Sequence, residues 1–395
     1  MVIRIYERDA YVFEFEAAVT SVDKEWISLD ATAFYPGGGG QMNDLGMICG
    51  LPVTDVVEKG DDIMHRVPKH SLRAGDKIWC SVDWERRYDM MIGHTAEHLL
   101  FGALKREVPE MNIVKIFISP ESKYVVVDRD IGWDVIEKAQ ISVNRSIIEN
   151  LSVTKYAMER DDPELENVRA KMERIDGDII TVVEIGDADV AACGGIHVRE
   201  TGEIGALFVD RKVSAGKDGY AIHFRVGIEA IVRSMELANK CLQMVEIMGT
   251  KPDDAVNATQ NLKHDNDLKT ERLRSVLAQT LGGLRPDVIN GVSVFSGTLA
   301  FNDKNVITNA AEKIKGAGNV AVFVALGDAL SVYLSSGSKK VDCAAILKNV
   351  ITKFGGRGGG KSDFAQGGVP DASKANDVMK ELLRNVKEAL EQKIN

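Results

Sequence analysis

The spacing of apolar residues changes its period several times along the 395-residue chain. In the first 85 residues, apolar and polar positions alternate over short runs such as 12–15 and 26–29, and a cluster of Gly, Asn and Asp lies at 37–46. Alternation with a period of two is typical of strands, and such clusters mark turns. Residues 1–85 are therefore predicted to form a small β-barrel or a curled sheet.

The period becomes helical from about Asp83 to Lys105, where apolar residues and His94 recur at helical spacing. A second helix is predicted at 132–150, and the acidic stretch 158–174 is also helix-prone. Strand-like runs complete this part of the chain, at 182–185, 205–209 and 221–226. The mixture predicts an α+β fold class, with an α/β domain over residues 86–227.

Helix-forming residues fill 228–281 and are interrupted once, at Gly249–Asp254, by a stop signal, a proline and a helix cap. Two long helices in a hairpin, forming an arm over 228–284, are the simplest interpretation. The arm is either a coiled-coil dimerisation element or an intramolecular linker. Strand runs that alternate with helical segments from Val292 onward predict a C-terminal α/β domain over 285–395.

Composition places the chain among ordinary globular proteins, with 45% hydrophobic and 27% charged residues. No apolar run approaches the roughly 20 residues that span a bilayer, so no membrane association is expected. The N-terminal residues mix charges of both signs and lack a signal peptide's apolar region, which favours a cytoplasmic location. The five cysteines are scattered, which argues against a disulfide framework.

Net charge is −10, which is unfavourable for a nucleic-acid partner because phosphate binding depends on Lys and Arg. The distribution is uneven, however. Residues 339–395 hold eleven Lys and Arg against seven Asp and Glu. A locally basic C-terminal module is therefore predicted within an acidic protein.

Two short motifs carry metal-binding residue types at matching intervals. His94 and His98 lie four residues apart, so on a helix both imidazoles project from one face. Cys193 and His197 have the same interval, and the glycines between them let the backbone bend tightly. Together they supply a Cys/His₃ set, whose donors suit Zn²⁺ better than Mg²⁺ or Ca²⁺.

The predicted zinc ion could be structural or catalytic. Four protein ligands close the tetrahedron of a structural site, whereas catalysis needs an exchangeable position. His197 is the ligand that we consider most able to give up its place to water or substrate.

A glycine run at Gly37–Gly40 follows strand-like residues and precedes Gln41. It matches neither the Walker A nor the dinucleotide-binding pattern. Consecutive glycines let main-chain N–H groups approach a ligand closely, and the Gln41 amide offers both a donor and an acceptor. The alternative is a flexible loop tip.

Taken together, three segments resemble the editing domain of alanyl-tRNA synthetase and its free-standing relatives, the AlaX trans-editing proteins. They are residues 29–41 (LDATAFYPGGGGQ), 94–100 (HTAEHLL) and 193–198 (CGGIHV). This resemblance runs from about residue 5 to 227. Residues 355–368 (GGRGGGKSDFAQGG) resemble the glycine-rich signature of the DHH-associated domain, so the whole chain resembles a long-form AlaX. No segment resembles an aminoacylation core.

The resemblance implies hydrolysis of the ester in tRNA(Ala) mischarged with serine, and of the glycine ester as a further substrate. It implies that Zn²⁺ polarises or orients the ester or an attacking water, while Gln41 and the amides of Gly38, Gly39 and Gly40 hold the substrate. Thr32 is the residue that we favour as hydrogen-bonding partner of the serine hydroxyl; the alternative is an ordinary strand residue.

Contacts to the body of the tRNA are predicted at Arg357 and Lys361 in the C-terminal glycine-rich segment, where the alternative role of the glycines is a structural turn. Lys212, Lys217 and Arg225 are candidates for guiding the acceptor end. A homodimer formed through the helical arm or the C-terminal domain is a further expectation.

Two rival functions remain open at this point. His94 to His98 also spells H-x-x-E-H, the pattern of inverzincin metallopeptidases, with Glu97 as general base. That interpretation leaves Cys193, His197 and the glycine run without a role. The other rival is a zinc-stapled tRNA-binding module without catalysis.

Overall fold

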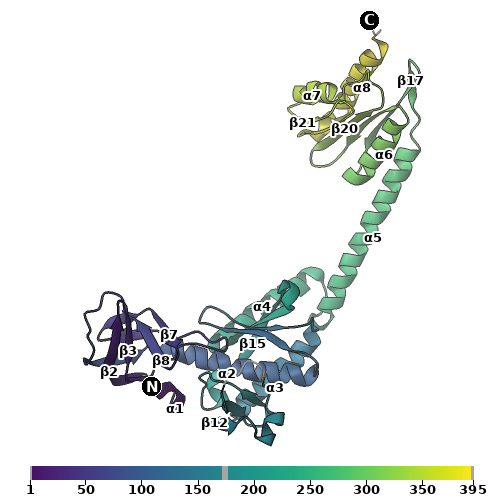
Figure 1. Cartoon of the computed structure of the whole chain (residues 1–395). Helices are drawn as coiled ribbons and strands as arrows, with labels where there is room; N and C mark the ends of the chain where they lie inside the picture. Colours follow the sequence, from purple (N-terminus) through teal and green to yellow (C-terminus); the bar gives the residue numbers. More distant parts are fainter. Residues whose placement is uncertain (1, 171–176, 393–395) are drawn as a thin grey trace. The chain divides into compact units, whose positions relative to one another are not determined.

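A computed structural model describes residues 2–170 and 177–392 of the chain. It separates into two compact units, residues 1–244 and 245–395 (Figure 1). Each unit has its own helices and sheets, and each is treated by itself below.

The first unit begins with a seven-stranded antiparallel sheet in the order β6-β5-β9-β2-β3-β8-β7, curled into a nearly closed barrel. Along β2 the inward positions Phe15, Ala17 and Val19 alternate with exposed or half-buried ones, as the period of two predicted. A short parallel pair, β1 (Ile3–Arg4) with β4 (Ala31–Thr32), lies outside this sheet, and helix α1 covers Ile5–Arg8. The seven strands are β2 (Glu14–Asp23), β3 (Trp26–Leu29), β5 (Gly46–Ile48), β6 (Leu51–Val53), β7 (Asp55–Lys59), β8 (Asp62–Arg66) and β9 (Lys77–Val82).

Helix α2 (Trp84–Glu107) leads from this sheet into the α+β part of the unit (Figure 1). The carboxylate of Asp83 caps it by accepting a hydrogen bond from the N–H of Arg86. Every residue from Gly93 to Leu104 is buried, as expected of a helix that is enclosed on all sides. The predicted helix is therefore present and lies at the centre of the unit.

Around α2 lie a four-stranded antiparallel sheet, β10-β11-β16-β15, helix α3 (Trp133–Glu149) and a three-stranded sheet, β12-β13-β14. The predicted helix at 132–150 and the predicted strands near 182, 207 and 221 are confirmed. The strands are β10 (Ile113–Ile118), β11 (Lys123–Val127), β12 (Val153–Glu159), β13 (Ile179–Ile185), β14 (Asp189–Ala192), β15 (Leu207–Ser214) and β16 (Tyr220–Val226).

The helix expected within 158–174 is wrong for the described part of that stretch. Residues 158 and 159 are the last two residues of strand β12, which pairs with β13 over its whole length. Further along the described stretch, Pro163–Asn167 form only a short 3-10 helix. Pairing with a neighbouring strand outweighed the helix propensity of the acidic residues. Residues 171–176 lie outside the described residues.

One hydrophobic core runs through the barrel-like sheet and the α+β part. It contains Ile27 and Ile63 from the first and Leu100, Val125 and Ile222 from the second. The boundary predicted at residue 85 thus marks a change from sheet to helix within a continuous core. The predicted domain boundaries themselves stay a prediction.

The arm contains the two predicted helices, α4 (Gly227–Met248) and α5 (Ala255–Gly282), with the break that Pro252 predicted between them. Most of α4 belongs to the first unit and α5 to the second. Their packing as a hairpin stays a prediction.

The second unit is built on a six-stranded mixed sheet, β17-β18-β19-β20-β22-β21. One face packs against α5 and α6 through residues such as Leu281 and Ile307, and the other against α7 and α8 through Leu347 and Leu382. This confirms the predicted C-terminal α/β fold. The elements are β17 (Asp287–Ile289), β18 (Val292–Leu299), α6 (Lys304–Gly316), β19 (Val320–Ala325), β20 (Leu330–Ser336), α7 (Cys343–Lys353), β21 (Arg357–Gly360), β22 (Phe364–Val369) and α8 (Ala375–Glu391).

The glycine-rich segment of this unit is a β-hairpin of β21 and β22, not a free loop. A side chain at Gly358 would place its Cβ 2.4 Å from the Cα of Gly367, and one at Gly360 would meet the backbone oxygen of Phe364 at 2.3 Å. Close strand packing therefore explains these glycines. Arg357 and Lys361 are exposed at either end of β21.

Candidate metal centre and cavity

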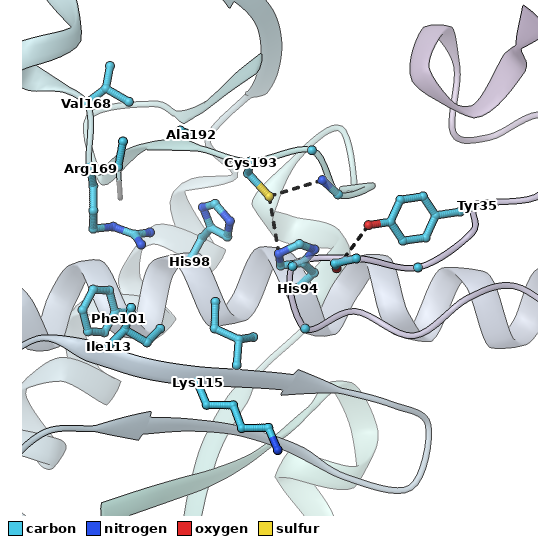
Figure 2. Close-up of a pocket in the computed structure, with 18 of the residues that line it drawn as sticks. Tyr35, His94, His98, Phe101, Ile113, Lys115, Val168, Arg169, Ala192 and Cys193 are labelled. Atoms are coloured by element: carbon cyan, nitrogen blue, oxygen red, sulfur yellow. Dashed lines mark hydrogen bonds between the residues drawn. The ribbon is translucent and has the colours of Figure 1, made fainter. Parts of the chain in front are cut away.

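The structure brings the four predicted ligands together. His94 and His98 project from α2, while Cys193 and His197 lie on the bend that follows β14. One ligand atom from each residue lies within 4.8 Å of all the others. Figure 2 shows the Cys193 sulfur pointing toward His94, with His98 beside it.

Each imidazole uses its Nδ1 atom for a hydrogen bond to another residue. Nδ1 of His94 lies 2.8 Å from Oε1 of Gln41, and Nδ1 of His98 lies 3.0 Å from Oδ2 of Asp189. Both partners are acceptors, so each Nδ1 carries a proton and each Nε2 is the nitrogen left for a metal ion.

The third imidazole is held by a threonine on α2. Nδ1 of His197 lies 3.1 Å from Oγ1 of Thr95, whose hydroxyl donates to the carbonyl oxygen of Met91 at 3.0 Å. Since its one proton is used there, Oγ1 accepts from His197. All three histidines therefore present Nε2 toward Cys193, the arrangement that metal-binding histidines need.

A buried acid and its counter-ion support His98. The Asp189 carboxylate accepts hydrogen bonds from Nε and Nη2 of Arg169 at 3.2 and 2.7 Å. Burial raises the pKa of Asp189, but the hydrogen bond with His98 and the charge of Arg169 outweigh burial and lower it. Asp189 is therefore a charged carboxylate, which increases the electron density of the His98 ring.

The surroundings of the Cys193 thiol favour its ionised form. Burial opposes its charged form, but the imidazoles of His94 and His197 lower the pKa of Cys193 well below its ordinary value. The N–H of Gly195 also donates to its sulfur at 3.4 Å. A thiolate is the form that binds metals.

Gly195 is required by close packing. A Cβ at this position would lie 2.3 Å from Cε1 of His94 and 2.9 Å from Oε1 of Gln41. At Gly194, by contrast, a Cβ would meet nothing within 4 Å. Only the second of the two glycines in the bend is thus sterically necessary.

The distances fit a zinc ion. The Cys193 sulfur lies 3.5 Å from Nε2 of His94 and 3.4 Å from Nε2 of His197. Sulfur and nitrogen ligands of a tetrahedral zinc are about 3.5 Å apart. Three neutral imidazoles and a thiolate also form a donor set that zinc prefers.

The predicted glycine loop, Gly37 to Gly40, borders this centre and is held by backbone hydrogen bonds. Gly37 to Gly40 all have positive φ angles, Gly38 and Gln41 exchange two backbone hydrogen bonds, and Gly40 accepts from the N–H of Ile118. A Cβ at Gly40 would lie 2.5 Å from the backbone oxygen of Ile116. The interpretation as a flexible loop tip is therefore wrong.

A cavity of about 980 Å³ opens beside the metal centre (Figure 2). His94, His98 and Cys193 lie on its wall with the glycine loop, strand β10, residues 168–170 and the end of β14. Its volume matches the upper range of small-molecule sites. The other lining residues include Arg4, Tyr6, Tyr35, Glu58, Phe101, Lys105, Met111, Ile113, Lys115, Ile116, Arg169 and Ala192.

Gln41 is buried between the glycine loop and the metal ligands. Its Oε1 accepts from His94 and, at 3.2 Å, from the N–H of Ile196. Its Nε2 has no hydrogen-bond partner within the described residues. A buried donor without a partner is costly, so it is a candidate for holding a substrate oxygen.

Thr32 lies elsewhere, on β4, and is not among the residues that line the cavity. Its Oγ1 lies 2.8 Å from Nε2 of His65 and accepts from the N–H of Phe34 at 3.1 Å. Burial lowers the pKa of His65 to about 4, so that ring is neutral. The structure gives the Thr32 hydroxyl two internal partners.

Glu97 is fully buried, and neither of its carboxylate oxygens has a hydrogen-bond partner in the described part of the chain. Burial raises its pKa. It is not one of the residues that line the cavity, where a peptidase's general base would have to meet its substrate. This geometry disfavours the metallopeptidase interpretation.

Sequence patterns did not predict three residues that orient the ligands, Asp189, Thr95 and Arg169. Nor did they predict Lys155, whose Nζ donates to the carbonyl oxygen of Gly195 at 3.1 Å. None belongs to a metal-binding spacing. The one available signal was Thr95 itself, which lies inside the H-x-x-E-H motif.

Two of the three basic residues predicted to guide the acceptor end form ion pairs with carboxylates. Lys212 pairs with Asp130, and Arg225 pairs with Asp210 at 3.0 Å. Lys217 lies in the short 3-10 helix Gly216–Asp218. None of the three lines the cavity.

Three family models match the chain. They are tRNA synthetases class II (A) over residues 6–86, the threonyl and alanyl tRNA synthetase second additional domain over 180–217, and the DHHA1 domain over 291–392. The second match contains Cys193 and His197.

A full-length relative decides the family. Alanyl-tRNA editing protein AlaX-L of Pyrococcus horikoshii is 30% identical over 98% of this chain and 99% of its own length. The chain belongs to the long-form AlaX family. As an AlaX-L relative it carries the DHH-associated domain after the arm, as the glycine-rich segment 355–368 predicted.

Alanine–tRNA ligases are also similar to this AlaX family member. Those of Methanoculleus marisnigri and Methanospirillum hungatei are 30% and 31% identical over 95% of the chain. The chain spans about two fifths of the length of these ligases, 42% of each. No helix in the described ranges is both long and apolar enough to cross a membrane.

Proposed function

We propose that this protein is a trans-editing hydrolase that deacylates Ser-tRNA(Ala), with Gly-tRNA(Ala) as a further substrate. The observation that carries the proposal is the opening of the Cys/His₃ centre onto a cavity bordered by the glycine loop, with Gln41 buried between that loop and the metal ligands. The name of the Pyrococcus relative, an alanyl-tRNA editing protein, supports the same reaction class.

Zinc is the metal that fits the residues present. His94, His98, Cys193 and His197 would hold it, because their donor atoms, tautomers and spacing suit this ion. When bound, it would supply Lewis-acid polarisation of the ester carbonyl or of a water molecule. That His197 is the exchangeable ligand stays a prediction; unlike His94, His98 and Cys193, it does not line the cavity.

Gln41 and the glycine loop are the groups that would hold the ester. The free Nε2 of Gln41 can donate to the oxygen that becomes negative as water attacks the ester carbonyl. Gly38, Gly39 and Gly40 all border the cavity. The N–H groups of Gly39 and Gly40 make no internal hydrogen bond in the described part of the chain, whereas that of Gly38 donates to the carbonyl oxygen of Gln41. The products are free serine and tRNA with its 3′ hydroxyl group restored.

The assignment of Thr32 as the partner of the serine hydroxyl stays a prediction. Its own hydroxyl already has two partners, so it would have to exchange one of them for the substrate. A site that hydrogen-bonds the serine hydroxyl would discriminate against alanine, which would leave a buried polar group without a partner.

The remaining expectations concern partners and location. Arg357 and Lys361 are exposed on the C-terminal hairpin, where they can meet tRNA phosphates. Ile228, Met235 and Leu242 are exposed at seven-residue intervals along α4, a spacing that suits a homodimer through the arm. The cytoplasmic location stays a prediction.

The decisive experiment measures hydrolysis of Ser-, Gly- and Ala-tRNA(Ala) and of an unstructured peptide by the purified chain, before and after chelation. We expect rapid loss of serine, little loss of alanine, no peptide cleavage and about one zinc ion per chain. Peptide cleavage would support the metallopeptidase instead. Zinc binding and tRNA binding without hydrolysis would support the zinc-stapled binding module.

A further inference from the structure

A row of aromatic side chains crosses the four-stranded sheet of the first unit. Phe117 on β10 is the cross-strand neighbour of Tyr124 on β11, which is the neighbour of His223 on β16, which in turn faces Arg211 on β15. The sheet register thus places four side chains from four strands in one line.

The rings contact one another along this line. Phe117 and Tyr124 are stacked, with centroids 5.2 Å apart and planes 23° apart, and Tyr124 and His223 are 4.8 Å apart at 39°. Nη2 of Arg211 donates to Nδ1 of His223 at 3.3 Å. The result is a continuous row of three rings in contact, which ends at the guanidinium group of Arg211.

This row lies on the open face of the sheet. The residues next to it along the strands, Val125, Ile222 and Phe224, point the other way into the core below. The three rings of the row are half-buried, and Arg211 is exposed. The rings therefore remain accessible to a ligand above the sheet.

Unpaired positive charges border both ends of the row. Nζ of Lys115 lies 5.9 Å from the Phe117 centroid at one end, and Arg211 closes the other. Neither makes an ion pair within the described residues, whereas Arg225 nearby is paired with Asp210 and Glu229. Burial and the charge of Arg211 lower the pKa of His223, so its ring is neutral.

The row is continuous with the metal cavity through strand β10. Ile113, Lys115 and Ile116 all line the cavity, and Phe117 follows directly. Figure 2 shows Lys115 on β10 with its side chain pointing away from Cys193 and His94. A strand of RNA whose end occupies the cavity would leave it beside the aromatic row.

We propose that this aromatic row is a platform for the unpaired 3′ nucleotides of the RNA substrate, whose bases stack on Phe117 and Tyr124 while phosphates meet Lys115 and Arg211. The inference rests on the proposed function, because it assumes that the cavity receives the charged 3′ end. Stacking on aromatic rings holds bases without reading their sequence. Sheets that present such rings bind two or three unpaired bases.

The competing explanation is that the rings only stabilise the sheet, as cross-strand aromatic pairs do. The two explanations differ in one observable. A platform changes the affinity for RNA that carries unpaired 3′ nucleotides, whereas a purely structural row changes only the stability of the protein.

The test uses the full chain and two uncharged, fluorescent tRNA(Ala) transcripts, one complete and one lacking its unpaired 3′ nucleotides. We expect the wild type to bind the complete transcript more tightly. The double variant Phe117→Leu/Tyr124→Leu should bind the complete transcript about ten- to hundredfold more weakly, close to the truncated one. The matched control Trp79→Leu removes an exposed ring from β9 and should change neither affinity.

Two outcomes would overturn the platform: a double variant that still prefers the complete transcript as the wild type does, or one that weakens both transcripts equally. If the double variant does not fold, Lys115→Gln provides the second measurement. It should reduce the slope of log affinity against log salt by about one for the complete transcript only. An unchanged slope would also overturn the proposal.

The same data separate this inference from the proposed function. Binding of uncharged RNA does not depend on ester hydrolysis, so a wild type that prefers the complete transcript but never deacylates Ser-tRNA(Ala) supports the platform and refutes the hydrolase. In an active enzyme, the double variant should raise KM and leave kcat nearly unchanged.

Discussion

Oδ2 of Asp189 lies 3.0 Å from Nδ1 of His98, although 91 positions separate the two residues in the sequence. The contact places a negative charge, held in turn by Arg169, on the far side of an imidazole whose Nε2 faces the Cys193 sulfur. Residues outside the ligand set therefore orient the ligands of the metal centre.

Asp189→Asn keeps the size of the side chain and removes its charge. Because the carboxylate orients His98 and increases its basicity, we expect zinc affinity to fall about 10- to 100-fold. Competition with a chromophoric chelator measures this directly. Asp187→Asn, in the exposed turn two residues earlier, is the matched control and should bind zinc like the wild type. Equal affinity for all three proteins would show that Asp189 does not tune the site.

Gly195→Ala adds one methyl group where His94 leaves no space for it. A Cβ 2.3 Å from Cε1 of His94 must displace that ring or the bend that carries Cys193. We expect loss of bound zinc and of Ser-tRNA(Ala) deacylation. Gly194→Ala, where a Cβ meets nothing within 4 Å, should retain both. The zinc content and the Ser-tRNA(Ala) deacylation rate of the two variants measure the difference. A Gly195→Ala protein that binds zinc and is active would contradict the packing argument.

Gln41→Glu separates the two ends of the Gln41 amide. The glutamate can still accept from His94 and Ile196, but it no longer offers the free Nε2 donor. We expect zinc content to stay near one ion per chain while kcat falls about 10²- to 10³-fold, the usual loss for one donor to a developing oxyanion. Single-turnover deacylation measures the change. Unchanged kcat would remove Gln41 from the proposed chemistry.

His65 gives the first unit a specific dependence on pH. Burial lowers its pKa to about 4 from an ordinary value of 6.5, so the unfolded chain takes up the proton first as the pH falls. The stabilising contribution of neutral His65 is complete above pH 6.5 and is lost as the pH falls toward about 4. The loss is on the order of 3 kcal/mol.

Urea unfolding followed by tryptophan fluorescence can measure this effect, because all four tryptophans lie in the first unit. His65→Gln should show a smaller loss of stability between pH 6.5 and pH 4, and the difference between the two curves isolates the His65 contribution from acid effects on the metal ligands. Parallel curves would mean that His65 is not the titrating group.

Local patterns in the sequence predicted the elements that carry the site. The period of two at residues 12–15 and 26–29 predicted strands, and the helical period around His94 predicted α2. The helix expected at 158–174 was wrong because β12 pairs with β13, a partner that lies beyond the window of any local pattern. Strand pairing depends on distant residues, whereas helix periodicity is contained within one segment.

The sequence by itself determined which side chains can bind the metal. Two four-residue intervals, His94 to His98 and Cys193 to His197, fix each pair on one helix face or bend, because spacing within one element sets side-chain direction. Only the tertiary structure decided that the pairs meet, that Asp189 and Thr95 orient them, and that Thr32 lies apart with His65. Contacts between separate elements follow from packing of the whole core, which no interval along the chain encodes.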